Sequence, residues 1–514
     1  MQVEPSAAAF AARYAAGEPQ VVWTTLVADL ETPVSAFLKI TAARAMSFLL
    51  ESVEGGEVRG RYSIIGLEPD VIFRVNGPAA EINRTLQNNP EAFAPVGAPP
   101  LQALRALISE SQITLPDALP PMAAGVFGYL GYDMVRQMED SLAAPRSDPI
   151  GIPDAIVIRP TLIIVFDAVE DAITVVTPVR PRAGTTAKTA HTQAVERLSA
   201  IVAALDRPLG KSAAPPSYPP QQATAGEKRD VPPRSNTTAE DFKRMVLRAK
   251  DYIFAGDIFQ VVLSQRFEAP FSMPPFALYR ALRRVNPSPY LFFLDFGTFA
   301  VAGSSPEVLV KTRRGTVTIR PLAGTRPRGT TPHEDKALEQ ELLADPKERA
   351  EHLMLLDLGR NDVGRVAAIG SVKVTDQFFI ERYSQVMHIV SNVEGKLRDD
   401  CDRLDALAAG FPAGTVSGAP KVRAMQIIDE LEKEKRGLYA GCVGYFSAGA
   451  DMDTCIALRT ALIKDGTMYV QAGAGIVADS DPAFEQQECI NKAKALFRAA
   501  EEAKRFASAT GQGQ

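Results

Sequence analysis

The chain has 514 residues, which is long enough for about two to four domains. Apolar residues make up 46% and charged residues 23%, as in ordinary globular proteins, and the net charge of −5 argues against nucleic acid as a partner. No apolar run approaches about 18 residues, and no basic region followed by an apolar stretch opens the chain. We therefore expect no membrane span and no signal peptide. The four cysteines lack C-x-x-C spacing, so we expect a reduced, cytoplasmic protein.

Residues 1–205 are predicted to mix strands and helices. The glycine-dense, aromatic segment Gly125–Tyr132 indicates close backbone approach within a sheet. Thr161–Phe166 and Ala172–Pro178 are rich in Val, Ile and Thr and predict a pair of strands. Ala194–Leu205 is expected to be a helix, because its apolar residues recur on one helical face.

A proline-rich segment, residues 206–237, divides the chain. Its composition cannot bury a core, so it is expected to be an exposed linker or long excursion. An ordered proline-rich loop packed on the surface is the alternative. The sequence therefore predicts an N-terminal domain over 1–205 and a second domain over 238–514.

The second part is predicted to open with a helix and a strand. Thr237–Glu240 fits a capping box at the start of the helix, and Gly256 ends it. Ile258–Phe267 then alternates as a strand, with Phe259 on the face opposite the polar Gln260.

Two later segments, Asp345–Glu351 and Asp481–Glu488, share one pattern. Each begins with Asp-Pro, which suits a helix start, and continues with an E-x-x-E pair on one helical face. If the two helices face one another, four carboxylates converge and repel unless a hard cation binds. Oxygen-only ligation favours Mg²⁺. Two solvated helix starts with favourable dipole charges are the alternative. The four carboxylates are Glu348, Glu351, Glu485 and Glu488.

Three single residues are further candidates. His388 lies in an apolar, strand-like run, where it is either a core residue or a proton carrier in a dry cleft. Arg459 is expected on a buried strand, where its guanidinium needs a ligand carboxylate or a structural Glu. Glu307 follows the expected strand Phe299–Gly303 and could be turn chemistry alone.

Three glycine-bearing turns could bind an anion through backbone N–H groups: Gly324–Thr325, Gly414–Gly418 and Gly473–Gly475. None matches a phosphate loop, and no dinucleotide-binding motif precedes a helix. Spacing alone thus indicates an enzyme with a Mg²⁺–carboxylate site, a carboxylate-bearing substrate and one or two acid/base groups.

Longer motifs carry a family resemblance. The chain resembles the chorismate-utilising enzymes, and within them the large, synthase component of anthranilate synthase, along nearly its whole length. The motifs are Leu49–Ser52, Arg61–Gly66, Gly256–Gln265, Asn286–Tyr290, Pro321–Thr325, Glu351–Asp362 and Gln471–Ile476. The resemblance implies an α+β fold with a four-layer α/β/β/α architecture, in which large antiparallel-rich sheets pack together and helices lie outside.

The same resemblance implies the site residues. Glu351 and Glu488 would bind Mg²⁺, with Glu348 and Glu485 as acidic neighbours, and Mg²⁺ would hold the ring carboxylate of chorismate. Glu307 would be the general acid that helps the ring hydroxyl depart, and His388 would assist pyruvate elimination. Thr325 joins these two in the expected catalytic set. The expected substrate contacts are Gly324, Thr325, Tyr439, Arg459, Gly473, Ala474 and Gly475.

Two positions discriminate within the family. Relatives that make isochorismate or salicylate carry Lys where Gln260 stands, and aminodeoxychorismate synthases carry a nucleophilic Lys where Ala323 stands. Both absences leave ammonia as the nucleophile. Cys442 is the nearest candidate for a glutaminase nucleophile, but the rest of that signature is missing. We therefore expect a separate glutamine amidotransferase subunit, in a hetero-oligomer that the family suggests is a heterotetramer.

The resemblance also implies feedback inhibition by tryptophan, the end product of the pathway that anthranilate formation begins. The expected pocket comprises Leu50, Glu51, Ser52, Pro289, Tyr290 and Leu291. A merely packed role for Leu49–Ser52 is the structural alternative. Two rival functions remain open at this point. One is an aminodeoxychorismate, aminodeoxyisochorismate or salicylate-type synthase, and the other is a non-catalytic regulator that keeps the fold.

Overall fold

A computed structural model describes residues 1–41, 44–54, 58–86, 89–209, 232–383 and 385–506. Its α-helices are α1 (Ala7–Ala15), α2 (Pro33–Thr41), α3 (Pro100–Glu110), α4 (Ala187–Leu205), α5 (Ala239–Phe254), α6 (Pro275–Val285), α7 (Pro332–Ala344), α8 (Pro346–Gly364), α9 (Arg403–Gly410), α10 (Lys421–Leu431) and α11 (Pro482–Glu502). Short 3₁₀ turns are η1 (Pro121–Ala123), η2 (Tyr132–Gln137), η3 (Gly414–Val416) and η4 (Ala503–Phe506).

The strands are β1 (Gln20–Val27), β2 (Ser47–Glu54), β3 (Val58–Asn76), β4 (Ala79–Asn83), β5 (Ala94–Val96), β6 (Gly125–Leu130), β7 (Ala155–Asp167), β8 (Ala172–Val179), β9 (Arg234–Ser235), β10 (Gln260–Pro270) and β11 (Tyr290–Asp295). They continue with β12 (Phe299–Ser305), β13 (Val308–Arg313), β14 (Thr316–Ile319), β15 (Leu322–Pro327), β16 (Lys373–Arg382), β17 (Val386–Lys396), β18 (Gly418–Ala419), β19 (Cys442–Ser447), β20 (Met452–Ile456), β21 (Thr460–Lys464) and β22 (Thr467–Ile476).

These strands form one hydrogen-bonded sheet that branches at β3. One branch runs through β2, β11, β12, β21 and β22 to β10. The other runs through β7, β6, β19, β20, β13 and β14 to β17. Phe48 and Phe292 of the first branch share a buried core with Phe127 and Val443 of the second, so the branches pack face to face.

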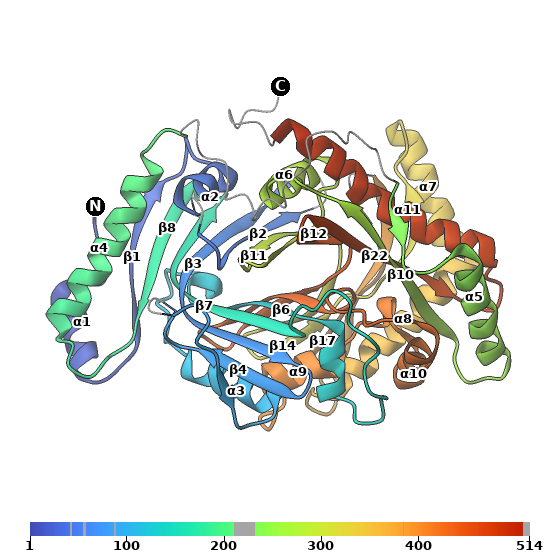
Figure 1. Cartoon of the computed structure of the whole chain (residues 1–514), viewed down its shortest axis with the longest axis horizontal. Coiled ribbons are helices and arrows are strands. Elements are labelled where there is room, and N and C mark those ends of the chain that lie inside the picture. Colours follow the sequence, from blue (N-terminus) through green and yellow to red (C-terminus); the bar gives the residue numbers. More distant parts are fainter. Residues whose placement is uncertain (42–43, 55–57, 87–88, 210–231, 384, 507–514) are drawn as a thin grey trace.

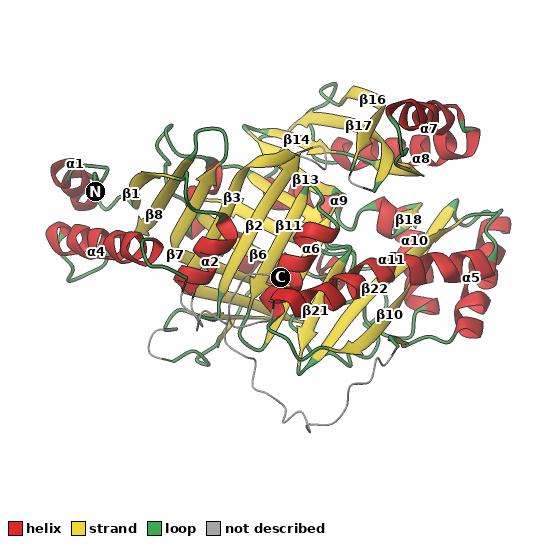
Figure 2. Cartoon of the chain, turned by 90° about the horizontal axis from the view of Figure 1, so that it is seen from above, coloured by secondary structure: helices red, strands yellow, loops and turns green. Residues whose placement is uncertain are grey.

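Helices cover the outer side of each branch. Helices α6 and α11 pack on β12 and β22, while α8 and α9 pack on β17 and β13 (Figures 1 and 2). A second core lies under α2, α4, α6 and α11, and a third under α3, α5, α8, α9 and α10. The expected α+β fold with an α/β/β/α layer order is therefore confirmed.

The four N-terminal segments for which the sequence predicted structure are β6, β7, β8 and α4. The expected strand pair is β7 and β8, with Ile163 opposite Val176. Gly128 lies in β6 between two neighbouring strands, where a Cβ would collide with the Ile156 carbonyl. The predicted helix at 194–205 begins earlier, at Ala187, because the hydroxyl of Thr186 caps it.

The proposed domain boundaries stay a prediction. Residues 210–231 of the proline-rich segment lie outside the described residues. Within the same segment, β9 pairs with β10, so its last residues belong to the sheet. Strands of both predicted parts also pair directly, as β2 with β11 and β6 with β19.

Two local predictions in the second part were wrong by small shifts. The cap of α5 is Thr238, which accepts a hydrogen bond from the Asp241 amide, instead of Thr237 with Glu240. Phe259 lies just before β10 and is 70% exposed, so it is not part of an apolar strand face. Gln260, the first residue of β10, does face away from the core residues Val261 and Leu263, as predicted. No helix in the described part of the protein is long and apolar enough to cross a bilayer.

Candidate active site

The two acidic helices bring their carboxylates to one cavity of about 480 Å³, here called the acidic cavity. The side chains of Asp345 and Asp481 cap α8 and α11 by accepting hydrogen bonds from backbone amides, as the sequence predicted. All four carboxylates of the E-x-x-E pairs line the cavity, together with Glu307, Gly324, Thr325, His388, Tyr439, Arg459, Gly473 and Gly475. Ala474 does not line it, because its side chain is buried in the core under the helices.

The four carboxylates differ in their partners. Glu348 accepts a hydrogen bond from Arg326 at 3.0 Å, and Glu488 pairs with Lys492 at 2.7 Å. Glu351 forms no ion pair with a described residue and accepts a hydrogen bond from the Gln260 amide at 3.1 Å. Glu485 keeps one buried oxygen, Oε2, without a partner among the described residues.

Burial and like charge raise the pKa of the two carboxylates that lack a cationic partner. Burial is the main cause for Glu351, with Glu348 and Glu488 adding to it. Burial and the neighbouring Glu488 raise the pKa of Glu485 to about 7. Burial and mutual repulsion thus disfavour the ionised carboxylates on this wall of the cavity. A hard cation such as Mg²⁺, which prefers oxygen ligands, fits such a wall. Among the described residues, however, no three such side chains are already gathered as a metal site.

Glu307 is a buried acid that keeps its proton at neutral pH. It lies two residues beyond β12 and is 6% exposed. Burial raises the pKa of its carboxyl to about 8, although Thr415 donates a hydrogen bond to both oxygens at 3.0 and 3.1 Å. Thr415, in the glycine-bearing turn at η3, is a site residue that sequence reasoning missed.

His388 is a neutral base at the cavity wall. Its Nδ1 lies 3.0 Å from both the Gly324 carbonyl and the Thr325 hydroxyl. A carbonyl only accepts, so we assign the proton to Nδ1, and this leaves Nε2, which has no partner among the described residues, as a free acceptor. Burial, with the nearby Arg459, lowers the pKa of the ring to about 4.

The backbone at Gly324 makes this arrangement possible. Gly324 has φ +76° at an irregular point of the β15–β17 pairing, a conformation that favours glycine. A Cβ there would also lie 3.2 Å from the Glu348 carboxylate.

Arg459 is not on a strand, contrary to the sequence prediction. It lies between β20 and β21 in a left-handed conformation, with φ +49°, which costs free energy for any residue other than glycine. Burial lowers the pKa of its guanidinium, and no described residue forms an ion pair with it. Of the two alternatives that the sequence left open, a ligand carboxylate therefore fits better than a structural Glu.

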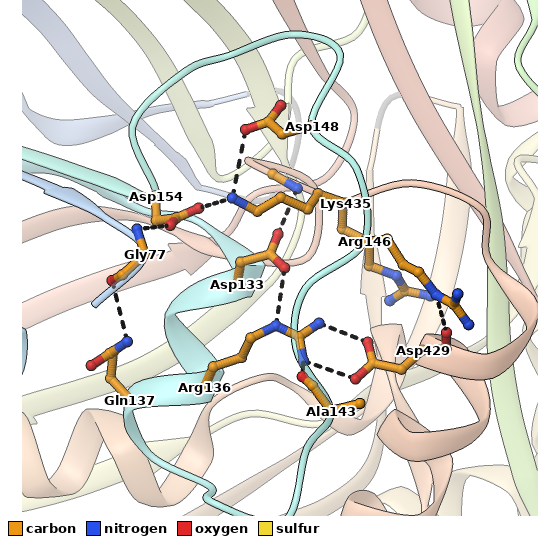
Figure 3. A network of polar contacts seen from close by, with 12 residues as sticks. Gly77, Asp133, Arg136, Gln137, Ala143, Arg146, Asp148, Asp154, Asp429 and Lys435 are labelled. Atoms are coloured by element: carbon orange, nitrogen blue, oxygen red, sulfur yellow. Dashed lines mark hydrogen bonds and ion pairs between the residues drawn. The ribbon is translucent and has the colours of Figure 1, made fainter. Parts of the chain in front are cut away.

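The segment that carries Tyr439 is anchored by a polar network shown in Figure 3. Lys435 pairs with Asp154 at 2.7 Å, and the Gly437 amide donates to Asp133 at 3.1 Å. Arg136 pairs with Asp429 at the end of α10, which ties η2 to the same segment. The contacts come from residues distant in the sequence, so the local sequence carried no signal for them.

A second, larger cavity of about 880 Å³ lies between the two branches of the sheet, and we call it the strand cavity. It is lined by Leu50, Glu51, Ser52, Pro289, Tyr290 and Leu291, the complete set expected from the sequence. Glu51 is already engaged: Arg283 pairs with it at 2.7 Å and the Tyr279 hydroxyl donates to it. Tyr290 donates to Asp453 at 3.1 Å.

The comparisons with known proteins agree with this geometry. Residues 49–498 match the family model described as chorismate binding enzyme. Anthranilate synthase component 1 of Cereibacter sphaeroides is 57% identical, over 97% of this chain and 98% of that protein. The crystal structure of anthranilate synthase component I from Streptococcus pneumoniae is 37% identical, with a TM-score of 0.74 over 92% of this chain and 98% of that one.

A more distant likeness shows the fold alone. The menaquinone-specific isochorismate synthase of Escherichia coli is 21% identical, with a TM-score of 0.67 over 94% of this chain and 95% of that one. Family membership therefore rests on the sequence matches and on the residues that line the acidic cavity. The chain belongs to the chorismate-binding enzymes and, within them, to the anthranilate synthase component 1 proteins.

Proposed function

We propose that this protein converts chorismate and ammonia to anthranilate, pyruvate and water, as the synthase component of a two-subunit anthranilate synthase. The observation that carries the proposal is that a protonated Glu307 and an unprotonated His388 Nε2 line the same cavity. The reaction needs a proton donor in one step and a proton acceptor in the next. Protonated Glu307 can serve as the donor, and neutral His388 can serve as the acceptor.

The first step forms a C–N bond and breaks a C–O bond. Ammonia attacks the ring of chorismate, and the ring hydroxyl leaves as water with the proton that Glu307 donates. The ammonium group formed on the ring then loses one proton, which restores the protonated Glu307. Gln260 and Ala323 support ammonia as the nucleophile, because neither a neutral amide nor a methyl group activates water or attacks the ring. The Gln260 side chain is buried and donates to Glu351, while its Oε1 has no described partner.

The second step removes the enolpyruvyl group. His388 Nε2 takes the ring proton, the ring becomes aromatic, and the bond between the ring carbon and the enolpyruvyl oxygen breaks. The released enolpyruvate takes a proton and becomes pyruvate. Arg459 and the backbone at Gly473 and Gly475 would bind the enolpyruvyl carboxylate.

We further propose that Mg²⁺ binds at the acidic wall of the cavity. Glu351 and Glu488 would be its ligands, with Glu348 and Glu485 beside them. The ion would orient the ring carboxylate of chorismate and draw electron density from it. The unpartnered Oε2 of Glu485 and the raised pKa of Glu351 support a cation at this wall.

Incubation of the pure protein with chorismate, Mg²⁺ and an ammonium salt at mildly alkaline pH tests the proposal. We expect fluorescent anthranilate and an equal amount of pyruvate. A para-aminated or non-aromatic product would assign the protein to a sister activity. Complete absence of product, with tryptophan still bound, would support a regulator that keeps only the fold.

We propose a glutamine amidotransferase subunit as the source of ammonia. Cys442 is not a suitable thiol for a glutaminase, because it is buried in β19 and burial raises the pKa of its thiol to about 12. Exposed aromatic side chains, here called the apolar patch, support the partner. The three largely exposed phenylalanines among the described residues are Phe254 at the end of α5, Phe259 just before β10 and Phe484 in the first turn of α11.

This patch adjoins the acidic cavity. Lys250 of α5 donates to the Ser480 carbonyl at 2.6 Å, just before α11, and the Phe259 amide donates to Ala419, just before α10. Phe484 also lines the cavity, and Figures 1 and 2 place α5, α10 and the start of α11 together. Exposed aromatic side chains beside a cavity suit a partner that delivers ammonia there.

Phe254→Ser combined with Phe259→Ser should weaken binding of the amidotransferase subunit by about tenfold or more. Ammonia-dependent activity should persist, because neither residue lines the acidic cavity. Ile369→Ser, an exposed apolar residue elsewhere, is the matched control. Calorimetry gives the affinity, and wild-type affinity in the double variant would place the docking surface elsewhere.

We also propose that tryptophan inhibits the enzyme from the strand cavity. Ser52→Phe should raise the tryptophan concentration for half inhibition by about tenfold or more, since the larger side chain enters the cavity lining. Ser52 lies against Gly60, so a thermal melt must accompany the assay. Ser52→Ala is the control, because it removes the hydroxyl without adding a larger side chain. An unchanged inhibition curve for a folded Ser52→Phe would reject the pocket.

A further inference from the structure

The acidic cavity and the strand cavity share a wall. Pro306 lines both of them, and it directly precedes the general acid Glu307. On the other side of the wall, Tyr383 lines the strand cavity while His388 lines the acidic cavity. Each proposed acid/base group therefore has an immediate neighbour that faces the other cavity.

Tyr383 contacts both halves of this wall. Its ring lies 5.4 Å from the His388 imidazole, centre to centre, at an interplanar angle of 56°. Its hydroxyl donates to Glu381 at 2.8 Å and lies 3.4 Å from the Pro306 carbonyl. The side chain is buried, and the Tyr383 amide donates to the Val386 carbonyl, which ties β16 to β17.

The acceptor of the hydroxyl belongs to the strand cavity. Glu381 lines that cavity, and so does Arg320, which forms an ion pair with it. Glu381 also lies opposite His388 in the β16–β17 pairing. A ligand that engages Arg320 or Glu381 would thus change the bond that fixes the tyrosine hydroxyl.

The His388 ring is buried between polar contacts and one aromatic neighbour. Nδ1 is held by Gly324 and Thr325, Nε2 has no partner among the described residues, and the Tyr383 ring lies beside the imidazole at a tilt. A shift of the tyrosine ring would therefore move the base relative to the substrate, and misplacement by about 1 Å is enough to slow catalysis strongly.

We propose that Tyr383 is a positioning residue that couples occupancy of the strand cavity to the placement of His388 and of the Pro306–Glu307 segment. This inference rests on the proposed function, in which the strand cavity holds tryptophan. Coupling is reciprocal, so bound substrate should weaken tryptophan binding by the same factor as tryptophan weakens substrate binding.

The test is Tyr383→Phe, which keeps the ring against His388 and removes the hydroxyl. The quantity measured is the coupling ratio, the dissociation constant of chorismate with saturating tryptophan divided by that without it. A regulated enzyme typically shows a ratio of about 5 to 150. We expect the ratio of the variant to fall below about threefold, while tryptophan still binds in calorimetry and kcat falls less than about tenfold.

Tyr445→Phe is the matched control. Tyr445 lines the strand cavity but packs near Phe127, away from the acidic cavity. Removing its hydroxyl should therefore leave the coupling ratio unchanged from that of the wild type. Glu381→Gln is the second variant. It keeps an acceptor for the tyrosine hydroxyl but weakens the pair with Arg320, and it should lower the ratio only in part.

The outcomes separate the two proposals. If the wild type is inhibited by tryptophan and folded Tyr383→Phe shows the same coupling ratio, the inference about Tyr383 is wrong and the proposed function stands. If the wild type neither binds tryptophan nor is inhibited by it, the proposed regulation fails and the inference fails with it. Should Tyr383→Phe not fold, an unreduced ratio in Glu381→Gln overturns the inference.

Discussion

Glu307→Gln is expected to lower turnover with ammonia by about a thousandfold. Glutamine preserves the size of the side chain and its bond to Thr415 but has no proton to give to the departing hydroxyl. Initial rates of anthranilate formation measure the effect. A variant that retains about a tenth of the wild-type rate would remove Glu307 from the role of general acid.

The pH dependence follows from the same residue. The pKa of the Glu307 carboxyl is raised to about 8. Below that pH the carboxyl is protonated and can donate its proton, and above it the carboxyl is ionised and cannot. At constant free ammonia, kcat/KM for chorismate, which reports the pKa values of the free enzyme, should therefore fall about tenfold per pH unit on the alkaline side. The low pKa of His388, about 4, keeps its base form available throughout this range.

Thr415→Val is the control for the assignment of this alkaline limb. The Thr415 hydroxyl favours the ionised carboxylate, and valine has a similar shape without the hydroxyl. Loss of the hydrogen bond should raise the pKa of Glu307 further and move the limb to higher pH. A limb that stays in place would have to come from another group.

Glu351→Gln and Glu488→Gln are each expected to lower Mg²⁺-dependent turnover by about a hundredfold or more. Each change removes a proposed ligand and a negative charge from the wall that would hold the ion. The fold should persist. Burial and like charge raise the pKa of Glu351, so its ionised form costs folding free energy at neutral pH that glutamine does not.

The measurements are the activity at a series of Mg²⁺ concentrations, direct calorimetric binding of Mg²⁺ and thermal unfolding. Glu501→Gln is the matched control, because Glu501 lies on the exposed side of α11 and outside the cavity. Normal Mg²⁺ binding in both Glu351→Gln and Glu488→Gln would rule out the proposed metal wall. If one variant does not fold, the Mg²⁺ binding of the other decides.

The parts of the site that the sequence predicted depend on local rules. Asp345 and Asp481 begin their helices because a carboxylate and a following proline suit a helix start wherever the segment lies. The E-x-x-E spacing then fixes which carboxylates share a helical face. That the two helices meet at one cavity could not be read from spacing, and the family resemblance supplied it.

The parts that were missed or wrong depend on distant contacts. The apolar neighbours of Arg459 predict a strand, but its left-handed backbone has no signature in the residue itself. Thr415 and Tyr383 gain their roles from Glu307 and His388, to which only the folded structure brings them. Phe259 fits an apolar alternation but lies outside the strand, since periodicity does not locate a strand end.

The pairing of β10 with β22 has a consequence for how the protein matures. Residues Val261–Pro270 of β10 pair with all of β22, although one strand lies near the middle of the sequence and the other close to its end. During synthesis, β10 emerges from the ribosome long before its neighbour exists, and α11 follows later still. A nascent polypeptide that ends before β22, or a chain cleaved there by a protease, therefore lacks one edge of the acidic cavity and two of its five glutamates, so such fragments should consume no substrate.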